Sequence, residues 1–230
     1  MSPRPRRRTT TSDLRERIIA AAWEQIAFEG APALSLRAIA RALCISAPSI
    51  YNYFPDRDAL VTALIIEAYY TFGTHQLEAR DAVPADDLRG RMKSIGLAYR
   101  TWALAFPQRY QLIFGTPIPG YAAPIEQIFP TAARSLSALV SVVEALRQAG
   151  KLKADNFPQI REDFKVGFEQ WKTYGGQVDS LSLSVAMLIW ARVHGLVSLE
   201  IAGNIPPCGP DGSALYRFEL ESVEQQFIQP

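Results

Sequence analysis

Few side chains in this sequence are placed to do covalent chemistry. The two histidines, His75 and His194, stand far apart, and no G-x-S-x-G motif presents a serine nucleophile. Cys44 and Cys208 form no C-x-x-C pair, so the spacing does not fit a standard zinc site. The one glycine-rich piece, "YGGQ", follows a predicted helix and does not fit a phosphate-binding loop. We therefore expect a protein that is not an enzyme and holds neither a metal nor a cofactor.

The stretch "RALCISAPSIYNYF", residues 41–54, instead presents groups for recognition. Its last part is predicted to be a helix over 47–53, with an outward face that suits a groove floor and phosphate contacts. The side chains on this face are Ala47, Pro48, Ser49, Tyr51, Asn52 and Tyr53. Pro48 fits the first turn of such a helix, where its missing N–H would be unpaired in any case. A small helical bundle with surface aromatics is the alternative, but two exposed tyrosines on one short helix favour recognition.

The elements that position this stretch are all predicted to be helices, because apolar residues recur at helical spacing and no convincing alternating strand is found. Ser35 is the expected N-cap of the helix before the turn, and Gly30 ends the preceding helix. The predicted helices here cover 12–30, 36–43, 47–53 and 56–80. Their core is expected from Ile39, Leu43, Ile45 and Ile50, with the small Ala40 at the close approach. This order of helices, with a tight turn between the second and third, indicates a helix-turn-helix.

The rest of the chain is predicted to continue as helices joined by loops. These helices cover 86–106, 107–114, 130–149, 155–173, 181–202 and 213–228. A proline-rich stretch, 115–130, is expected to be a long loop or a set of short turns. The most apolar segment, 181–203, carries Arg192 and Glu200, so we expect a buried helix and not a membrane span of about 20 apolar residues. The sequence thus predicts an all-α protein of roughly ten helices.

Basic charge is concentrated at the start of the chain. The formal net charge is only +1, yet residues 1–60 hold nine arginines and six acidic residues. The run "RPRRR" predicts a disordered basic arm over residues 1–11, suited to DNA or a membrane surface, or simply solvated. No apolar segment typical of a signal peptide follows, and the cysteine usage favours a reducing cytoplasm.

The stretch "SLRAIARALCISAPSIYNYFPDRDAL" resembles the N-terminal domain of the TetR family of transcriptional repressors. The resemblance covers residues 12–66 and depends on a capped helix, a turn, a Tyr-x-x-Phe helix end and an Arg-acid-x-Leu helix start. It implies a DNA-binding helix-turn-helix domain over 12–58, with side chains that face the groove or hold phosphates. The implied DNA-binding residues are Ser35, Arg37, Ala47, Pro48, Ser49, Tyr51, Asn52, Tyr53 and Arg57.

Two residues depart from the family pattern, Cys44 in place of the usual glycine and Pro55 in place of a small or polar residue. Glycine is favoured in such a turn because the backbone there is expected to adopt positive φ, which costs a residue with a side chain about 1 kcal/mol. We therefore interpret Cys44 as a tolerated, slightly strained substitution. Redox sensing by its thiol is the alternative.

The second half resembles one TetR subgroup, named for a Trp–His–Gly signature that is met here in "WARVHGLVSLEIAG" at Trp190, His194 and Gly195. The resemblance implies a ligand-binding and dimerisation domain over 59–230, linked to the first domain by the helix over 56–80. Residues 151–180 fit the subgroup less well and are interpreted as an insertion.

An effector pocket is predicted from aromatic side chains close to the proline-rich loop, because large aromatics beside irregular backbone can wall an apolar cavity. The predicted pocket residues are Trp102, Phe106, Tyr110, Phe114, Tyr121, Trp190 and His194. The alternative is that each aromatic simply fills the core. For His194 a structural hydrogen bond across a helix crossing, permitted by Gly195, is favoured over a ligand or metal role.

Apolar stripes on the last two helices predict the dimer interface, although the same stripes fit core packing within one chain. The predicted interface residues are Leu188, Leu196, Leu199, Leu215, Phe218 and Phe227. By resemblance, two chains would form a four-helix bundle and space their reading heads by about 34–36 Å. The resulting hypothesis is a dimeric repressor on a palindromic DNA operator, released by a small hydrophobic or aromatic effector. The alternatives are a transcriptional activator with the same head and a helical protein-binding adaptor.

Overall fold

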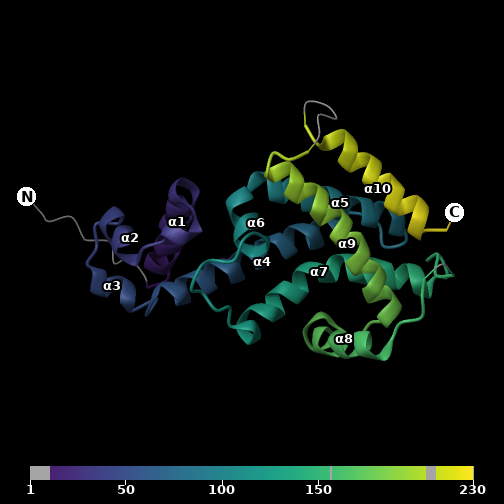
Figure 1. Cartoon of the computed structure of the whole chain (residues 1–230), viewed down its shortest axis with the longest axis horizontal. Coiled ribbons are helices and arrows are strands. Elements are labelled where there is room, and N and C mark those ends of the chain that lie inside the picture. The colour runs from purple at the N-terminus through teal and green to yellow at the C-terminus, as the bar shows by residue number, and fades with distance from the viewer. Residues whose placement is uncertain (1–10, 156, 206–210, 230) are drawn as a thin grey trace, which may run out of the picture. The chain divides into compact units, whose positions relative to one another are not determined.

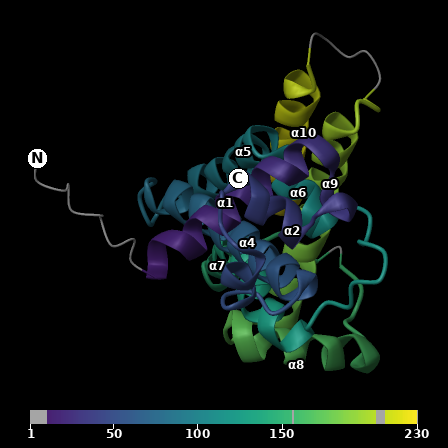
Figure 2. The same ribbon diagram turned by 90° about the vertical axis from the view of Figure 1, so that its left-hand side faces the viewer.

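The computed structural model describes residues 11–155, 157–205 and 211–229, and these residues form ten α-helices and one 3-10 helix without a strand (Figures 1 and 2). Within these described ranges, a single isolated bridge pairs Leu152 with Ile228. The all-α prediction is confirmed. The predicted basic arm over 1–11 lies outside the described residues, apart from Thr11, which begins the first helix.

The helices follow the predicted order closely. They are α1 (Thr11–Glu29), the 3-10 helix η1 (Ala31–Ala33), α2 (Leu36–Ala42), α3 (Ala47–Tyr51), α4 (Arg57–Asp81), α5 (Leu88–Ala105), α6 (Pro107–Phe114), α7 (Ile125–Gln148), α8 (Glu162–Gly175), α9 (Ser180–Ile201) and α10 (Ser213–Phe227). Helix α3 ends two residues earlier than predicted, and α8 begins seven residues later than the predicted start at 155.

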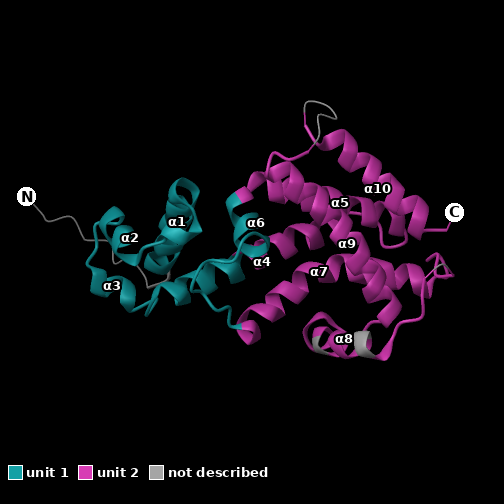
Figure 3. Ribbon diagram, in the orientation of Figure 1, with its two compact units in different colours: residues 1–67, 108–124 teal, residues 68–107, 125–230 magenta. Residues whose placement is uncertain are grey.

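The chain divides into two compact units (Figure 3). Unit 1 comprises Met1–Glu67 and Gln108–Pro124, and unit 2 comprises Ala68–Pro107 and Ile125–Pro230. The division therefore differs from the predicted ranges 12–58 and 59–230. Residues 108–124 join unit 1 because side chains tie them to α4: the hydroxyls of Thr62 and Tyr121 lie 2.9 Å apart, and Arg109 pairs with Glu67 at 3.1 Å.

The core of unit 1 lies where α1, α2, α3 and the first part of α4 meet. Ile18, Ile39, Ile50, Leu60 and Leu64 are fully or almost fully buried there. Each such side chain contributes about 1.5–3 kcal/mol of burial free energy, which holds the short helices α2 and α3 in place. The predicted small residue at the crossing, Ala40, is also buried, whereas the predicted core residues Leu43 and Ile45 are only partly buried.

Unit 2 is organised around α7, which packs against α5, α8 and α9. Its core combines aliphatic residues of α7 and α9, such as Val143 and Val185, with Trp171 of α8. The close approach of α4 and α7 depends on Gly73, where an added Cβ would lie 2.9 Å from Cα of Ser135. A neighbouring buried side chain, Gln76, donates to the Ser135 carbonyl at 3.1 Å and satisfies it.

The prediction that 115–130 is entirely loop is wrong at its end, because α7 begins at Ile125 and includes Pro130. A proline in the second turn removes one backbone hydrogen bond. The helix extends through it because Ile128 is buried and Phe129 packs against the core of unit 2. The burial of these two apolar side chains offsets the lost hydrogen bond.

Two helices, α7 and α9, are long and apolar enough to cross a membrane by length and composition alone. A core helix of a soluble protein passes the same test, and both helices carry fully buried residues, among them Val143 and Val185. Helix α9 also bears Arg192, which pairs with Glu219 of α10. The apolar composition of α7 and α9 is therefore explained by the packing of these helices in unit 2.

Candidate DNA-binding surface and effector cavity

The turn between α2 and α3 is closed by two backbone hydrogen bonds. The N–H of Cys44 donates to the Arg41 carbonyl at 3.1 Å, and the N–H of Ile45 donates to the Ala40 carbonyl at 3.0 Å. This is the Schellman pattern, which needs a left-handed residue at the position of Cys44. Among the described residues other than glycine, only Cys44 has positive φ, at 53°. The predicted positive φ at this turn is confirmed.

Several predicted DNA-binding residues lie on the outside of unit 1. Arg37, Pro48, Tyr51 and Asn52 are exposed, and the Tyr51 side chain is 43% accessible. Ser35, Ala47, Ser49, Tyr53 and Arg57 are only partly exposed. The structure brings Ser35, Arg37, Tyr51 and Arg57 together around one shallow cleft beside Pro55. Neither Arg37 nor Tyr51 has a hydrogen-bond partner among the described residues, so both are available to a ligand of this face.

The two serines use their hydroxyls within the unit. The Ser35 hydroxyl accepts from the N–H of Ala38 at 3.4 Å, which confirms the predicted N-cap of α2. The Ser49 hydroxyl lies 2.7 Å from that of Ser46. Both serines therefore orient the helices that carry the exposed side chains.

The Arg57 guanidinium is already engaged within unit 1, and its role in holding phosphate stays a prediction. Its guanidinium donates to the backbone carbonyls of Ala31, Pro32 and Leu34 at 3.1–3.3 Å. These carbonyls lie in and after η1, and the first residue of α4 lies close enough to donate to them. Arg57 therefore anchors η1 to α4.

A hydrogen-bonded cluster that the sequence pattern did not indicate joins three helices of unit 1. Nε1 of Trp23 on α1 donates to Glu67 on α4 at 3.2 Å, and a guanidinium N–H of Arg109 on α6 donates to the other carboxylate oxygen at 3.1 Å. The Arg109 guanidinium also lies over the Trp23 ring, 4.9 Å from its centroid. These residues are 42 and 44 positions apart in sequence, so no local spacing could have found them.

The seven predicted pocket residues are not brought together around one cavity in either unit. Tyr110, Phe114 and Tyr121 belong to unit 1, whereas Trp102, Phe106, Trp190 and His194 belong to unit 2. Tyr110 and Trp102 are buried, Tyr110 packs on Phe114 at 5.1 Å, and Trp102 packs on Phe106 at 5.7 Å. Tyr110 and Trp102 are almost fully buried, so they fill the core, as the alternative interpretation predicted.

His194 has the structural hydrogen bond that was predicted. Its Nδ1 lies 3.0 Å from the Tyr99 hydroxyl on α5, and its ring stacks on Trp190 at 4.9 Å. Burial lowers the pKa of His194, which favours the neutral ring. The glycine next to it is not what permits this crossing, because a Cβ added at Gly195 would meet no other atom of the chain within 4 Å.

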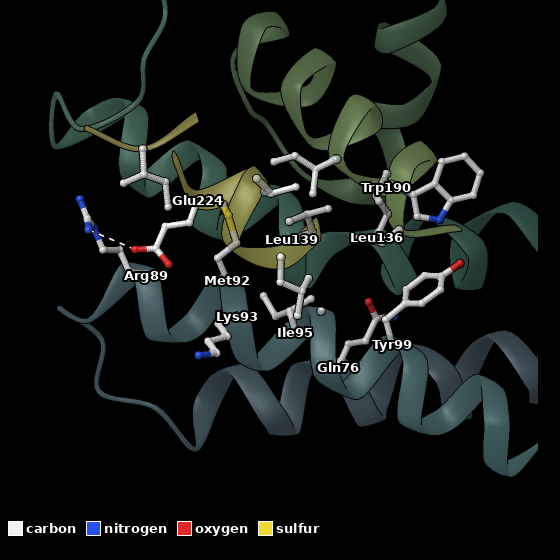
Figure 4. Close-up of a pocket in the computed structure, with 16 residues that line it drawn as sticks. Gln76, Arg89, Met92, Lys93, Ile95, Tyr99, Leu136, Leu139, Trp190 and Glu224 are labelled. Atoms are coloured by element: carbon white, nitrogen blue, oxygen red, sulfur yellow. Dashed lines mark hydrogen bonds and ion pairs between the residues drawn. The ribbon is translucent and has the colours of Figure 1, made fainter. Parts of the chain in front are cut away.

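One small cavity in unit 2 is lined by side chains of α4, α5, α7, α9 and α10 (Figure 4). Its lining residues include Gln76, Arg89, Met92, Lys93, Ile95, Tyr99, Leu136, Leu139, Ile189, Trp190, Val193, Leu220, Val223, Glu224 and Ile228. Trp190 is the one predicted pocket residue among them. The cavity measures about 30 Å³, which is room for one or two water molecules.

The predicted interface residues fall into three groups. Leu188, Leu199 and Phe218 are exposed, at 50%, 44% and 69%, while Leu196 and Leu215 are partly exposed. Phe227 does not belong to the surface: it is 7% exposed and its ring stacks on Phe157 within unit 2. It faces inward because the chain after α10 pairs with Leu152 through Ile228, which turns that end of the helix onto the core.

Comparison with known proteins identifies both halves of the chain. Residues 18–64 match the family model described as bacterial regulatory proteins, tetR family, and residues 92–223 match that of the tetracyclin repressor-like C-terminal domain. The HTH-type transcriptional regulator Rv1816 of Mycobacterium tuberculosis is 31% identical over 209 residues, which cover 86% of this chain and 85% of that protein.

Solved structures agree with this result. The crystal structure of the regulatory protein SCO4313 has 38% sequence identity and a TM-score of 0.74, covering 96% of this chain and 98% of that one. A protein from Rhodococcus sp. RHA1 also has a TM-score of 0.74, at 21% identity, and covers 97% of this chain and all of that one, so it shows the fold alone. Members of this family are regulators that bind DNA and dimerise, and they are not enzymes. The chain belongs to the TetR family of transcriptional regulators.

Proposed function

We propose that this regulator is a homodimeric repressor that binds a palindromic operator in the cytoplasm and leaves it when a small hydrophobic effector binds. The observation that carries the DNA-binding part is the cleft in unit 1 where the unpaired side chains of Arg37 and Tyr51 meet. Arginine reads guanine or holds phosphate, and tyrosine reaches phosphate and base edges, so this cleft suits the edge of a major groove.

Around this cleft, the reading face consists of the exposed residues of α3 and the start of α2. Pro48 and Ala47 offer apolar contact to thymine methyl groups, while Asn52 and Tyr53 reach the backbone. Arg41, exposed in the last turn of α2, adds a cation on the same short helix as Arg37. Arg57 supports the face indirectly through its hydrogen bonds to η1.

The exposed face of α9 supports dimerisation. Leu188, Ala191, Gly195 and Leu199 recur at helical spacing along this face, and Leu188 and Leu199 are about half exposed. Gly195 has open space where a side chain would be, so a second helix could approach the α9 backbone closely. Phe218 on α10 adds an exposed aromatic of the type enriched at interfaces. A two-fold dimer would cover all of these groups.

Chain connectivity supports transmission of an effector signal. Helices α4 and α6 each have residues in both compact units, and the Trp23–Glu67–Arg109 cluster fastens them to α1 within unit 1. A ligand that shifts either helix would therefore act on the DNA-reading unit. By linkage, operator DNA and effector would weaken each other's binding by the same factor.

The test is binding to DNA from upstream of the protein's own gene, measured against salt concentration. Phosphate contacts release counterions, so we expect affinity to fall steeply as salt rises. Arg37→Ala and Tyr51→Ala should each weaken operator binding by about tenfold. Arg217→Ala and Tyr70→Ala remove exposed side chains of unit 2 and serve as matched controls. Affinity that is independent of salt, or unchanged in both reading-face variants, would overturn the proposed DNA contacts.

Dimerisation is tested by sedimentation of the free protein. Leu188→Glu introduces a charge on the proposed α9 interface and should convert dimers to monomers at micromolar concentration. Val166→Glu changes an even more exposed apolar residue, on α8, and should leave the dimer intact. A Leu188→Glu protein that remains fully dimeric would show that α9 is not the interface.

A further inference from the structure

The cavity of Figure 4 is polar at both ends, but only one end carries charged side chains. At one end lie Gln76, whose amide N–H groups donate to the carbonyls of Phe72 and Ser135, and Tyr99, whose hydroxyl bonds His194. At the other end lie the charged side chains of Arg89, Lys93 and Glu224. Lys93 is exposed and has no partner among the described residues. The walls between the two ends are aliphatic side chains, Trp190 and the thioether of Met92.

The charged end is closed by the last residues of the described chain. A guanidinium N–H of Arg89 donates to the Glu224 carboxylate at 3.1 Å, and another donates to the carbonyl of Gln229. Glu224 and Ile228 both line the cavity, so the segment 224–229 covers its mouth. The Arg89 and Glu224 side chains are 45% and 37% exposed. An ion pair this exposed contributes little net stability, so exchanging its carboxylate partner is energetically cheap.

From this arrangement we propose that the cavity binds an amphipathic anion, a linear apolar chain that ends in a carboxylate. The ligand carboxylate replaces that of Glu224 on Arg89, with Lys93 as a second cation, and the apolar chain lies along Met92, Leu139 and Val223. Arginine binds carboxylates through two parallel hydrogen bonds, and the ligand offers the same geometry as Glu224. This inference rests on the proposed function, because it names the chemical class of the effector.

The cavity must enlarge to admit such a chain, and its lining contains side chains that can move. Met92 has three rotatable bonds and adapts readily to new shapes. Leu220 fills the space above Gly96, where an added Cβ would lie 2.5 Å from its Cδ2. A change of the Leu220 rotamer therefore opens room beside α5. Release of the Arg89–Glu224 pair frees the Glu224 side chain at the mouth, while backbone hydrogen bonds to Lys151 and Lys153 keep the segment 224–229 in place.

The experiment is calorimetric titration of the full chain with decanoate, kept below its micelle concentration, and with decan-1-ol and decylamine as probes of equal chain length. We expect decanoate to bind at least about tenfold more tightly than either. Arg89→Gln and Lys93→Gln should each weaken decanoate binding by about tenfold and leave the alcohol unaffected. Glu224→Gln should strengthen decanoate binding, because it removes the competing carboxylate.

Two controls separate this site from other apolar surfaces. Lys165→Gln removes an exposed cation of α8 that pairs with Glu162, and it should leave binding unchanged. Ile160→Ser alters a separate groove of unit 2, about 610 Å³, which Phe157, Met187 and Leu188 also line. Equal binding of alcohol and carboxylate would overturn the proposal, as would loss of decanoate binding in Ile160→Ser but not in Arg89→Gln.

Operator binding is measured separately in the presence of decanoate. Release of the operator by decanoate, weakened in Arg89→Gln, supports both the site and the proposed function. Calorimetric binding that leaves operator affinity unchanged supports the site and contradicts its role as the effector site. Operator release without any dependence on Arg89 or Lys93 overturns the site and leaves the repressor proposal standing.

Discussion

The hydroxyl of Tyr99 and Nδ1 of His194 lie 3.0 Å apart, and this hydrogen bond joins α5 to α9 in unit 2. The His194 ring also stacks on Trp190, and its Nε2 lies 3.4 Å from the Ser198 hydroxyl. These three neighbours are uncharged. Burial consequently lowers the pKa of His194 from its ordinary value of 6.5. The histidine of the Trp–His–Gly signature therefore links α5 and α9 as a neutral hydrogen-bonded ring.

The first prediction concerns stability in mild acid. Below pH 6.5 the unfolded chain takes up a proton at His194 more readily than the folded chain does, so the free energy of unfolding falls as the pH drops through this value. The contribution is fully present above pH 6.5. His194→Gln should flatten this part of the profile in urea unfolding measured at several pH values. His75→Gln removes the other histidine and should retain the slope; a profile unchanged by His194→Gln would refute the assignment.

Glu144 sets the behaviour in stronger acid. Hydrogen bonds from Arg147 above all, and from Gln148, lower the pKa of Glu144 from 4.5 to about 2. Because the folded pKa is the lower one, the stabilisation is present above pH 4.5 and is lost as the pH falls towards 2. Glu144→Gln should remove this acid-dependent part of the stability, measured by thermal unfolding. Glu126→Gln, at an exposed position of the same helix, should not; equal profiles for both variants would contradict the prediction.

The left-handed backbone of Cys44 predicts a gain on substitution by glycine. Relief of about 1–2 kcal/mol of backbone strain is partly offset by the greater freedom of glycine in the unfolded chain, which leaves a net gain of about 0.5 kcal/mol. Cys44→Ala retains the Cβ and should bring no gain, so it separates backbone strain from loss of the thiol. Urea unfolding compares the three proteins. A Cys44→Gly protein no more stable than Cys44→Ala would count against strain at this turn.

The carboxylate of Glu67 holds α1 and α6 together through Trp23 and Arg109. Glu67→Gln removes the charge that both donors share and should cost about 1–2 kcal/mol, since these groups are only partly exposed. Amide hydrogen exchange should become faster in residues 108–114. Glu78→Gln, at an exposed position farther along α4, is the control. Unchanged exchange over 108–114 in Glu67→Gln would show that the cluster does not fasten α6.

Features that depend on neighbours in sequence could be predicted well. The N-cap at Ser35 and the positive φ at Cys44 follow from interactions that span three to five residues, and the structure has both. Helical periodicity placed most helix ends within a few residues. The start of α7 was missed because a proline usually marks a boundary, whereas here burial of Ile128 outweighs one lost hydrogen bond.

Features that depend on contacts across the chain were predicted poorly. The sequence did not predict that the Arg57 guanidinium binds carbonyls more than 20 residues away. Phe227 was predicted at the dimer interface because it belongs to the apolar stripe of α10. An apolar stripe on a helix packs equally well against the core of its own chain or against a partner chain, so the stripe does not distinguish the two. The charged end of the cavity was not predicted, because Arg89 and Glu224 are 135 residues apart.

The sequence by itself determined the helices, the turn between α2 and α3, and the family. Local backbone preferences and motif spacing depend on residues that are close together in the sequence. Only the tertiary structure decided which polar side chains are already satisfied and which remain available. It showed that Arg57 and His194 are used internally, whereas Arg37, Tyr51 and Lys93 have no partner among the described residues. The physical reason is that a hydrogen bond or ion pair needs two groups within a few ångströms, and folding alone brings distant residues to that distance.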